Sequence, residues 1–175
     1  MLILVTGGAA SGKSEHAEKL LCARAHSKLY LATMQPFGKS AQARIARHRA
    51  LREGKGFNTL ERTLDLRSLK IDRHYDGILL EDLGNLLANE IFSPDGAADK
   101  CVEFILEGIK NLKLYCDTLM IVSNEIFSDE GGYPPATENY IQKLADLHSQ
   151  IAQEADAVYE SVCGILLPIK EMKTE

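Results

Sequence analysis

Gly7-Gly8-Ala9-Ala10-Ser11-Gly12-Lys13-Ser14 is a complete GxxxxGK[ST] phosphate-binding loop. It follows an apolar run at residues 2–6 that predicts a buried strand. It precedes a segment in which Ala17, Leu20 and Leu21 recur at helical spacing. A strand, a glycine-rich loop and a helix in this order are the context in which such a loop binds a nucleotide. The stretch therefore predicts a P-loop fold and a site for a nucleoside triphosphate.

The residue types of this loop have a chemical reason. Glycines let the backbone curl, so that successive N–H groups converge on phosphate oxygens, and the following helix adds its positive N-terminal end. We expect Lys13 to reach the β- and γ-phosphates and the Ser14 hydroxyl to bind Mg²⁺. A glycine-rich turn without a ligand is the alternative, and the presence of both Lys13 and Ser14 argues against it.

The composition bounds the class of protein. The 175 residues are 45% hydrophobic and 26% charged, which is typical of a globular chain, and we expect residues 1–175 to form a single domain. The formal net charge of −5 argues against general affinity for nucleic acids or anionic membranes. No apolar run approaches the roughly 20 residues that span a bilayer, and the N-terminal residues lack a basic signal-peptide region. We therefore expect a cytoplasmic protein.

Strand and helix patterns alternate along the chain, which predicts an α/β fold with three layers and a mainly parallel central sheet. Further strands are expected at 28–33, 57–60, 78–80, 118–123, 157–162 and 165–169. Further helices are expected at 40–52 with Ser40 as the N-cap, at 64–69, 83–92 and 98–114, and at 137–154. Such sheets bind ligands at the carboxyl ends of their strands, where the P-loop, Thr33 and Glu81 all fall.

The apolar strand Ile78-Leu79-Leu80 ends in Glu81-Asp82 and looks like a Walker B element. A carboxylate at such a tip can hold Mg²⁺ or its water, and we expect Glu81 to do so together with Ser14. Asp82 is expected to cap the following helix. A carboxylate at a strand end is often only a cap, so the metal role depends on the neighbouring P-loop. Asn124-Glu125, at another strand end, could orient a nucleotide or form a structural turn.

Three basic residues recur at helical spacing on the second predicted helix. Arg44, His48 and Arg52 are four residues apart and share one face. Guanidinium groups suit phosphate recognition and disfavour the imidazolium form of His48, and a neutral imidazole beside a polyphosphate is a competent nucleophile. On spacing alone, a solvated basic face with an incidental histidine is the simpler explanation.

Together these residues resemble a known family, the bifunctional adenosylcobinamide kinase/adenosylcobinamide-phosphate guanylyltransferases of cobalamin biosynthesis. The resemblance runs nearly end to end and is carried by the P-loop with its flanks, Tyr30 to Thr33, Ala43-Arg44-Ile45, His48-Arg49, Arg52, Thr59, Glu61, Leu79 to Glu81, Asn89, Val122 to Glu125, Pro135, Asn139, Ala155 to Tyr159 and Gly164-Ile165.

The resemblance implies two reactions. The first phosphorylates the hydroxyl of adenosylcobinamide with ATP or GTP, and the second transfers GMP from GTP to that phosphate through a histidine, which here is His48. It also implies Mg²⁺, a RecA-like fold and a homo-oligomer. The residues implied for nucleotide binding are Gly7, Gly8, Ala9, Ala10, Ser11, Gly12, Lys13, Ser14, Thr33, Arg44, Arg52, Glu61 and Glu81, with Lys13 and His48 as the catalytic pair.

Other functions remain open at this point. The chain could keep only one activity, as a P-loop small-molecule kinase, or be a non-catalytic GTP-binding module of the same descent. A GTPase switch is disfavoured because the chain has no NKxD element for guanine. A nucleoside monophosphate kinase is disfavoured because no arginine follows Arg73 to furnish a lid.

Overall fold

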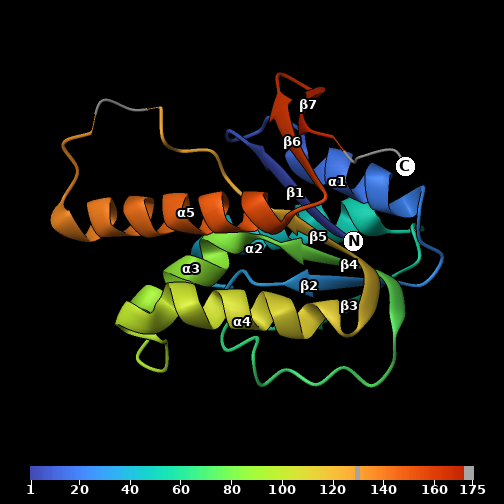
Figure 1. The fold of residues 1–175 in the computed structure, drawn as a ribbon, viewed down its shortest axis with the longest axis horizontal. Helices are drawn as coiled ribbons and strands as arrows, with labels where there is room; N and C mark the ends of the chain where they lie inside the picture. The colour runs from blue at the N-terminus through green and yellow to red at the C-terminus, as the bar shows by residue number, and fades with distance from the viewer. Residues whose placement is uncertain (129–130, 172–175) are drawn as a thin grey trace.

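The computed structural model describes residues 1–128 and 131–171. Its strands are β1 Leu2–Gly7, β2 Lys28–Ala32, β3 Phe57–Glu61, β4 Tyr75–Glu81, β5 Cys116–Val122, β6 Ala157–Val162 and β7 Ile165–Lys170. Its helices are α1 Lys13–Cys22, α2 Gly38–Arg52, α3 Leu83–Phe92, α4 Cys101–Lys113 and α5 Pro135–Glu154, with a 3₁₀ turn, η1 Ala98–Lys100, before α4. The strands form a seven-stranded sheet in the order β3-β2-β4-β5-β1-β6-β7 (Figure 1).

The sheet is parallel from β3 to β6, and β7 pairs antiparallel with β6. Leu2 and Leu4 of β1 point into a core shared with α3, α4 and α5, whereas Ile3 and Val5 point into a second core shared with α1. Because a parallel sheet is covered on both faces, its inner strands carry continuous apolar runs, at residues 2–5, 78–80 and 119–122, instead of an alternating pattern. The prediction of a three-layer α/β fold with a mainly parallel sheet is confirmed.

Two local predictions were wrong. No helix forms at 64–69, because Asp65 adopts a φ of +48° and Asn111 of α4 donates to the carbonyls of Leu66 and Leu69 at 3.0 and 2.8 Å. These tertiary contacts hold an irregular segment where the local pattern favoured a helix. Helix α2 begins at Gly38 after Phe37 as its N-cap rather than at Ser40, since Gly38 turns the chain with a φ of +78°.

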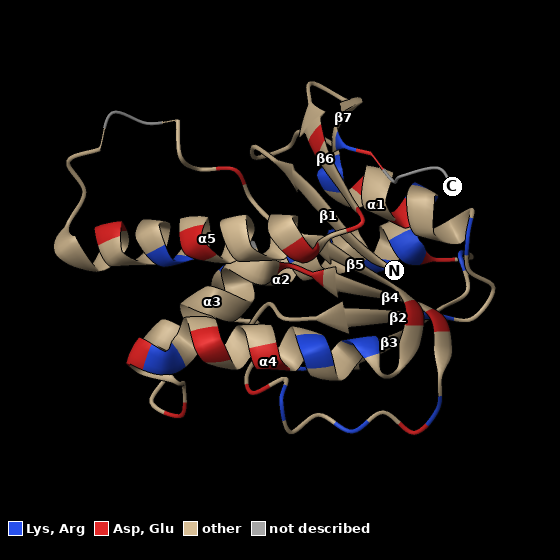
Figure 2. Ribbon diagram, in the orientation of Figure 1, with Lys and Arg blue, Asp and Glu red and all other residues tan. Residues whose placement is uncertain are grey.

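Charged residues are spread over the outer helices. On α4 the acidic residues, Glu103 and Glu107, precede the basic residues, Lys110 and Lys113, and α5 also carries both signs, so neither sign runs the length of either helix (Figure 2). Among the described residues, none of the helices combines the length and apolar character that crossing a bilayer requires.

Candidate active site

The P-loop joins the carboxyl end of β1 to the first turn of α1. Gly12 caps the helix with a φ of +94°, a left-handed conformation that glycine adopts without strain. Gly7 has a φ of +154°, and an added Cβ would lie 2.5 Å from both the Ser11 Oγ and the Ser161 carbonyl. Lys13 lies back across the loop, with its Nζ donating to the Gly8 carbonyl at 3.1 Å. Burial lowers the pKa of Lys13.

The hairpin between β6 and β7 holds the P-loop in place through hydrogen bonds to Ser11. The carbonyl of Ser11 accepts hydrogen bonds from the Ser161 Oγ at 2.8 Å and from the Gly164 N–H at 3.0 Å. The Ser161 Oγ also lies 3.0 Å from the His16 Nδ1. Sequence reasoning missed Ser161, whose signal was only a small polar residue within an otherwise strand-like run. The predicted phosphate loop is therefore shaped by contacts with the far end of the chain.

Glu81 connects the P-loop with the end of β4. Its Oε1 accepts a hydrogen bond from the Ser14 Oγ at 2.7 Å, and its Oε2 is buried without a hydrogen-bond partner. Burial, with the nearby Asp82 carboxylate, raises the pKa of Glu81 to about 8. The two residues predicted as metal ligands thus lie side by side, and one carboxylate oxygen there has no partner.

Thr33 and Asp82 organise the strand ends beside Glu81. Asp82 caps α3 as predicted, accepting the Asn85 N–H at 2.7 Å. Thr33 is fully buried, donates its hydroxyl to the Asp82 carbonyl at 2.8 Å and donates its N–H to the Glu81 carbonyl at 3.0 Å. In this conformation Thr33 positions the carboxylates, and its contact with a nucleotide stays a prediction.

His48 faces Glu81 from α2. Its Nδ1 lies 4.0 Å from the Glu81 Oε1 and is buried without a hydrogen-bond partner. Burial, followed by the charges of Arg52 and Arg44, lowers the pKa of His48. The direction agrees with the sequence argument that the imidazolium form of His48 is disfavoured, and burial contributes more to it than any single arginine.

A cavity of about 340 Å³ separates α2 from the ends of β2, β3 and β4. His48, Arg52, Tyr30 and Glu81 line it. The Arg52 guanidinium carbon lies 3.4 Å from the centre of the Tyr30 ring, and one of its terminal nitrogens, Nη1, is buried without a partner. Stacking of this kind holds the cation in place while leaving its N–H groups available to a ligand.

The remaining predicted residues lie at the edge of this cavity or beyond it. Glu61 lines the cavity and pairs with Arg49 at 2.6 Å, both side chains being largely exposed. Arg44 does not line the cavity and is exposed on the same helix, where its charge still acts on His48. The structure thus brings Ser14, Glu81 and His48 together and leaves Arg44 outside their immediate group.

Unpartnered polar atoms gather around the P-loop and the cavity. Four buried side-chain atoms there have no hydrogen-bond partner among the described residues: Ser11 Oγ, His48 Nδ1, Arg52 Nη1 and Glu81 Oε2. Buried polar groups are normally satisfied, so a cluster of exceptions points to a missing polar ligand. A hydroxyl, a carboxylate and oxyanion-binding cations are the groups that a metal-bound nucleotide needs.

A second histidine, missed by the sequence analysis, lies behind the loop that follows β5. His148 of α5 places its Nε2 2.6 Å from the Ser123 Oγ, and burial lowers its pKa to about 4. Glu125 donates its N–H to the Gly7 carbonyl at 2.9 Å and accepts the Phe127 N–H at 2.8 Å. These contacts are those of a structural turn, and a role of Glu125 in orienting a nucleotide stays a prediction.

Two solved structures share this architecture. A KaiC-like protein of the archaeon Pyrococcus horikoshii superposes with a TM-score of 0.53 at 12% identity, covering 99% of this chain and 81% of that one. An ATPase of a bacterial type III secretion system superposes with a TM-score of 0.52 at 9% identity, covering 95% and 56%. At such low identity the likeness supports a RecA-like fold and nothing finer.

Sequence comparison identifies the family. The family model described as cobinamide kinase / cobinamide phosphate guanyltransferase matches residues 3–169. The bifunctional adenosylcobalamin biosynthesis protein CobP of Pseudomonas aeruginosa is 32% identical over 95% of this chain and 96% of its own length. The CobU proteins of Escherichia coli and Salmonella typhimurium are 31% and 32% identical over 97% of this chain and 100% of theirs. The chain therefore belongs to the cobinamide kinase / cobinamide phosphate guanyltransferase family.

Proposed function

We propose that this protein phosphorylates the hydroxyl of adenosylcobinamide with ATP or GTP, and then transfers GMP from GTP to the new phosphate through a covalent intermediate on His48. The product is adenosyl-GDP-cobinamide. Membership of the family supports the two reactions. The observation that carries the assignment to this site is the half-buried imidazole of His48, with a lowered pKa, beside Glu81 and the P-loop.

The proposed kinase step uses the P-loop. Its backbone N–H groups and Lys13 hold the phosphates while the cobinamide hydroxyl attacks the γ-phosphorus and the nucleoside diphosphate leaves. Ser14 and Glu81 fit Mg²⁺, because a hydroxyl and a carboxylate with a free oxygen are hard oxygen donors that leave room for phosphate oxygens. When bound, Mg²⁺ neutralises developing charge on the phosphates.

The proposed transferase step uses His48. A ring nitrogen attacks the α-phosphorus of GTP, a P–N bond forms, and the bond to the leaving pyrophosphate breaks. An oxygen of cobinamide phosphate then attacks the same phosphorus and releases His48. Arg52, held against Tyr30, is suited to bind phosphate oxygens during both displacements. Glu61, at the edge of the cavity, is proposed to contact the nucleotide.

We further propose that the chain works as a single nucleotide-binding domain within a cytoplasmic homo-oligomer. One continuous sheet supports the first point. Edge strand β7 supports the second, because Ile165 and Ile169 are 62% and 63% exposed and Leu167 is 42% exposed. Light scattering on the purified protein measures the oligomer directly.

The decisive experiment follows the GMP group. Protein incubated with GTP labelled at the α-phosphate and Mg²⁺ should acquire a covalent label that is acid-labile and base-stable, as expected of a phosphoramidate. Adding adenosylcobinamide phosphate should discharge the label into adenosyl-GDP-cobinamide. Bound GTP without any covalent label, combined with phosphorylation of adenosylcobinamide, would reduce the function to a kinase alone.

A further inference from the structure

A groove of about 520 Å³ lies beside the segment 34–37 that follows β2, on the side opposite the cavity that contains His48. Its walls include two aromatic rings, Phe37 and Phe92, which are 78% and 59% exposed. Leu64 and Pro94 add apolar surface, while Asn89 and Asp95 supply polar groups. Large exposed aromatic side chains that line one groove are typical of a binding surface rather than of solvated surface.

This groove and the cavity beside His48 share a wall. Met34 and Pro36 line the cavity, whereas Gln35 and Phe37 line the groove. Successive side chains of the extended segment therefore point to opposite sides. A ligand in the groove is separated from the His48 cavity by the thickness of this one segment.

Hydrogen bonds fix the position of the groove relative to Glu81. Asn89 donates its side-chain N–H to the Thr33 carbonyl at 2.8 Å, and Thr33 donates its own N–H to the Glu81 carbonyl at 3.0 Å. Asn89 also donates to the Thr63 carbonyl at 3.0 Å. The groove wall and the tip of β4 are thus joined through Thr33.

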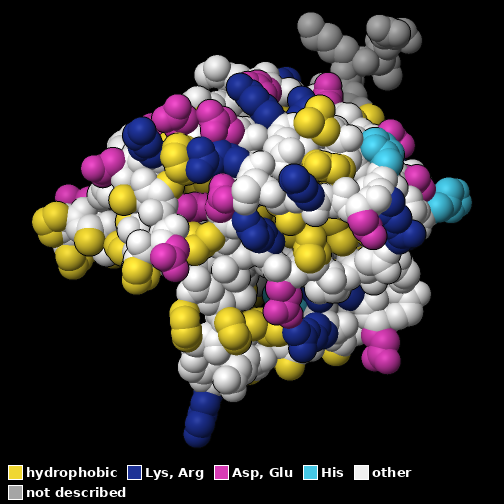
Figure 3. Space-filling model, turned by 90° about the horizontal axis from the view of Figure 1, so that it is seen from below, with side chains coloured by type: hydrophobic (Ala, Val, Ile, Leu, Met, Phe, Trp, Pro, Cys, Tyr) yellow, Lys and Arg dark blue, Asp and Glu magenta, His cyan; other side chains and the backbone are white. Residues whose placement is uncertain are grey.

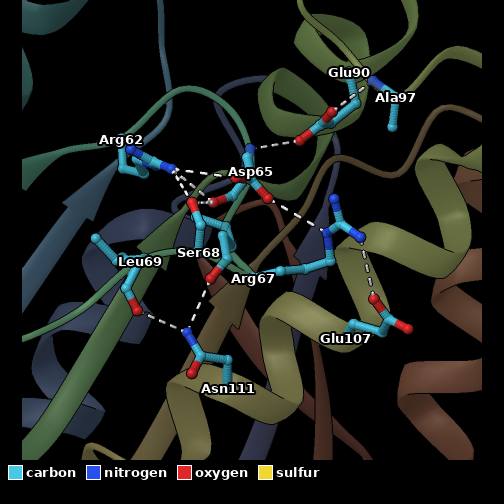
Figure 4. A network of polar contacts seen from close by, with 10 residues as sticks. Arg62, Asp65, Arg67, Ser68, Leu69, Glu90, Ala97, Glu107 and Asn111 are labelled. Atoms are coloured by element: carbon cyan, nitrogen blue, oxygen red, sulfur yellow. Dashed lines mark hydrogen bonds and ion pairs between the residues drawn. The ribbon is translucent and has the colours of Figure 1, made fainter.

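The irregular segment that carries Leu64 is also held in place. Figure 4 shows the polar network around it, in which Glu90 of α3 accepts the Asp65 N–H at 2.7 Å and the Ala97 N–H at 2.9 Å. Arg62 donates to the Asp65 carbonyl at 2.9 Å, and Arg67 pairs with the Asp65 carboxylate at 3.3 Å. A preformed groove loses less entropy when it binds a ligand than a groove that must first order itself.

We propose that this groove binds the corrin ring of the cobinamide substrate, an inference that rests on the proposed function. A corrin is a broad, largely apolar macrocycle with a rim of amide side chains. The face of the ring that the adenosyl group leaves open can pack against Phe37 and Phe92, and its amide N–H groups can donate to the Asp95 carboxylate. The reacting hydroxyl of cobinamide sits on a flexible side arm, so the ring can rest in the groove while the arm passes the 34–37 segment toward Glu81 and His48.

Exposed apolar side chains are not unique to this groove. The face in Figure 3 carries several separate groups of them, with basic and acidic side chains between. The groove differs from these other groups because it shares a wall with the cavity beside His48. The test must therefore compare a groove residue with an equally exposed apolar residue elsewhere.

The variant Phe92→Ser removes a ring at the exposed end of α3, away from the residues proposed for catalysis. Equilibrium dialysis measures the binding of adenosylcobinamide, whose concentration is determined from its visible absorbance. A non-hydrolysable GTP analogue is present, so that binding is measured without turnover. We expect the Kd for adenosylcobinamide to rise on the order of tenfold with the loss of one buried aromatic face. The Kd for the GTP analogue should be unchanged, and Phe92→Tyr should bind like the wild type.

Leu114→Ser is the matched control, since Leu114 is 75% exposed in the turn before β5, at the amino end of the strands, whereas the groove lies at their carboxyl ends. Equal corrinoid binding by Phe92→Ser and the wild type overturns the groove proposal alone. A wild-type protein that binds GTP but no corrinoid contradicts the proposed function itself. A Phe92→Ser protein that changes its oligomeric state by light scattering, with corrinoid affinity intact, reassigns the groove to contact between copies of the chain.

Discussion

The Nδ1 of His48 lies 4.0 Å from the Glu81 Oε1, the same oxygen that accepts the Ser14 hydroxyl at 2.7 Å. The Glu81 carboxylate therefore lies between the proposed nucleophile on α2 and Ser14 at the end of the P-loop. A small movement of α2 would let the Nδ1–H donate to Glu81, leaving the other ring nitrogen as the nucleophile. The two proposed reactions thus meet at a single side chain.

Replacing the proposed nucleophile should separate transfer from binding. His48→Ala should lose the covalent GMP label completely and retain its affinity for GTP within a few-fold, because the P-loop is intact. Labelling with α-labelled GTP and a GTP binding titration measure the two effects. His74→Ala is the control, since His74 is exposed and pairs with Asp117 at the amino end of β5. A label that survives in His48→Ala removes this residue from the mechanism.

Replacing the P-loop lysine should reduce both reactions. Lys13→Ala should lower kcat by about 10²–10³-fold, the usual effect of deleting one preorganised group that stabilises developing charge. Steady-state phosphorylation of adenosylcobinamide measures it. Lys19→Ala, on the same helix but exposed and paired with Glu15, should behave like the wild type. Equal turnover by the Lys13 and Lys19 variants contradicts a catalytic P-loop.

Glu81 should destabilise the nucleotide-free protein as pH rises. Its pKa is raised from 4.5 to about 8, so between these values the folded state binds a proton that the unfolded state has released. The free energy of unfolding therefore falls with pH across this window, by at most about 1.4 kcal/mol per pH unit.

Glu81→Gln, which cannot ionise, should thus be inactive yet more stable than the wild type, with the gain larger at pH 8 than at pH 5. Urea unfolding at the two pH values, without nucleotide or metal, checks this. A stability difference that does not change with pH would show that Glu81 titrates normally.

The covalent step should tolerate mild acid. Because burial and Arg52 lower the pKa of His48 below 6.5, its neutral form persists at pH 6.5, and the labelling rate should fall only below that pH. Arg52→Gln removes one of the charges that lower the pKa of His48, so the labelling rate should begin to fall at a higher pH. Arg49→Gln, whose charge is paired with Glu61, is the control and should leave the midpoint unchanged. Single-turnover labelling across pH measures the midpoint, and identical midpoints in the two variants would contradict this electrostatic account.

Replacing two neighbouring glycines with alanine should change the free energy of unfolding by very different amounts. Gly7→Ala places a Cβ 2.5 Å from the Ser161 carbonyl at a φ of +154° and should destabilise the protein by about 1–3 kcal/mol. Gly8→Ala meets nothing within 4 Å and should change the free energy of unfolding little. Thermal unfolding of the nucleotide-free variants compares them, and equal stabilities would mean that the hairpin does not constrain the loop.

Local patterns were sufficient for most of the fold. Helix α3 and strand β6 occupy their predicted ranges, since apolar periodicity and a capping Asp82 act over neighbouring residues. The segment 64–69 failed as a helix because Asn111, distant in sequence, binds its carbonyls. A pattern read along the chain contains no information about such a partner.

For the site, the residue types along the chain specified the chemical groups: the P-loop with Lys13 and Ser14, the carboxylate at the tip of β4, and a histidine among arginines. Long-range packing placed His48 beside Glu81, brought Ser161 to the P-loop and raised the pKa of Glu81 to about 8. This division arises because a residue's type sets which reactions it can perform. Burial and the long-range pairing of strands and helices set its neighbours, and therefore its charge.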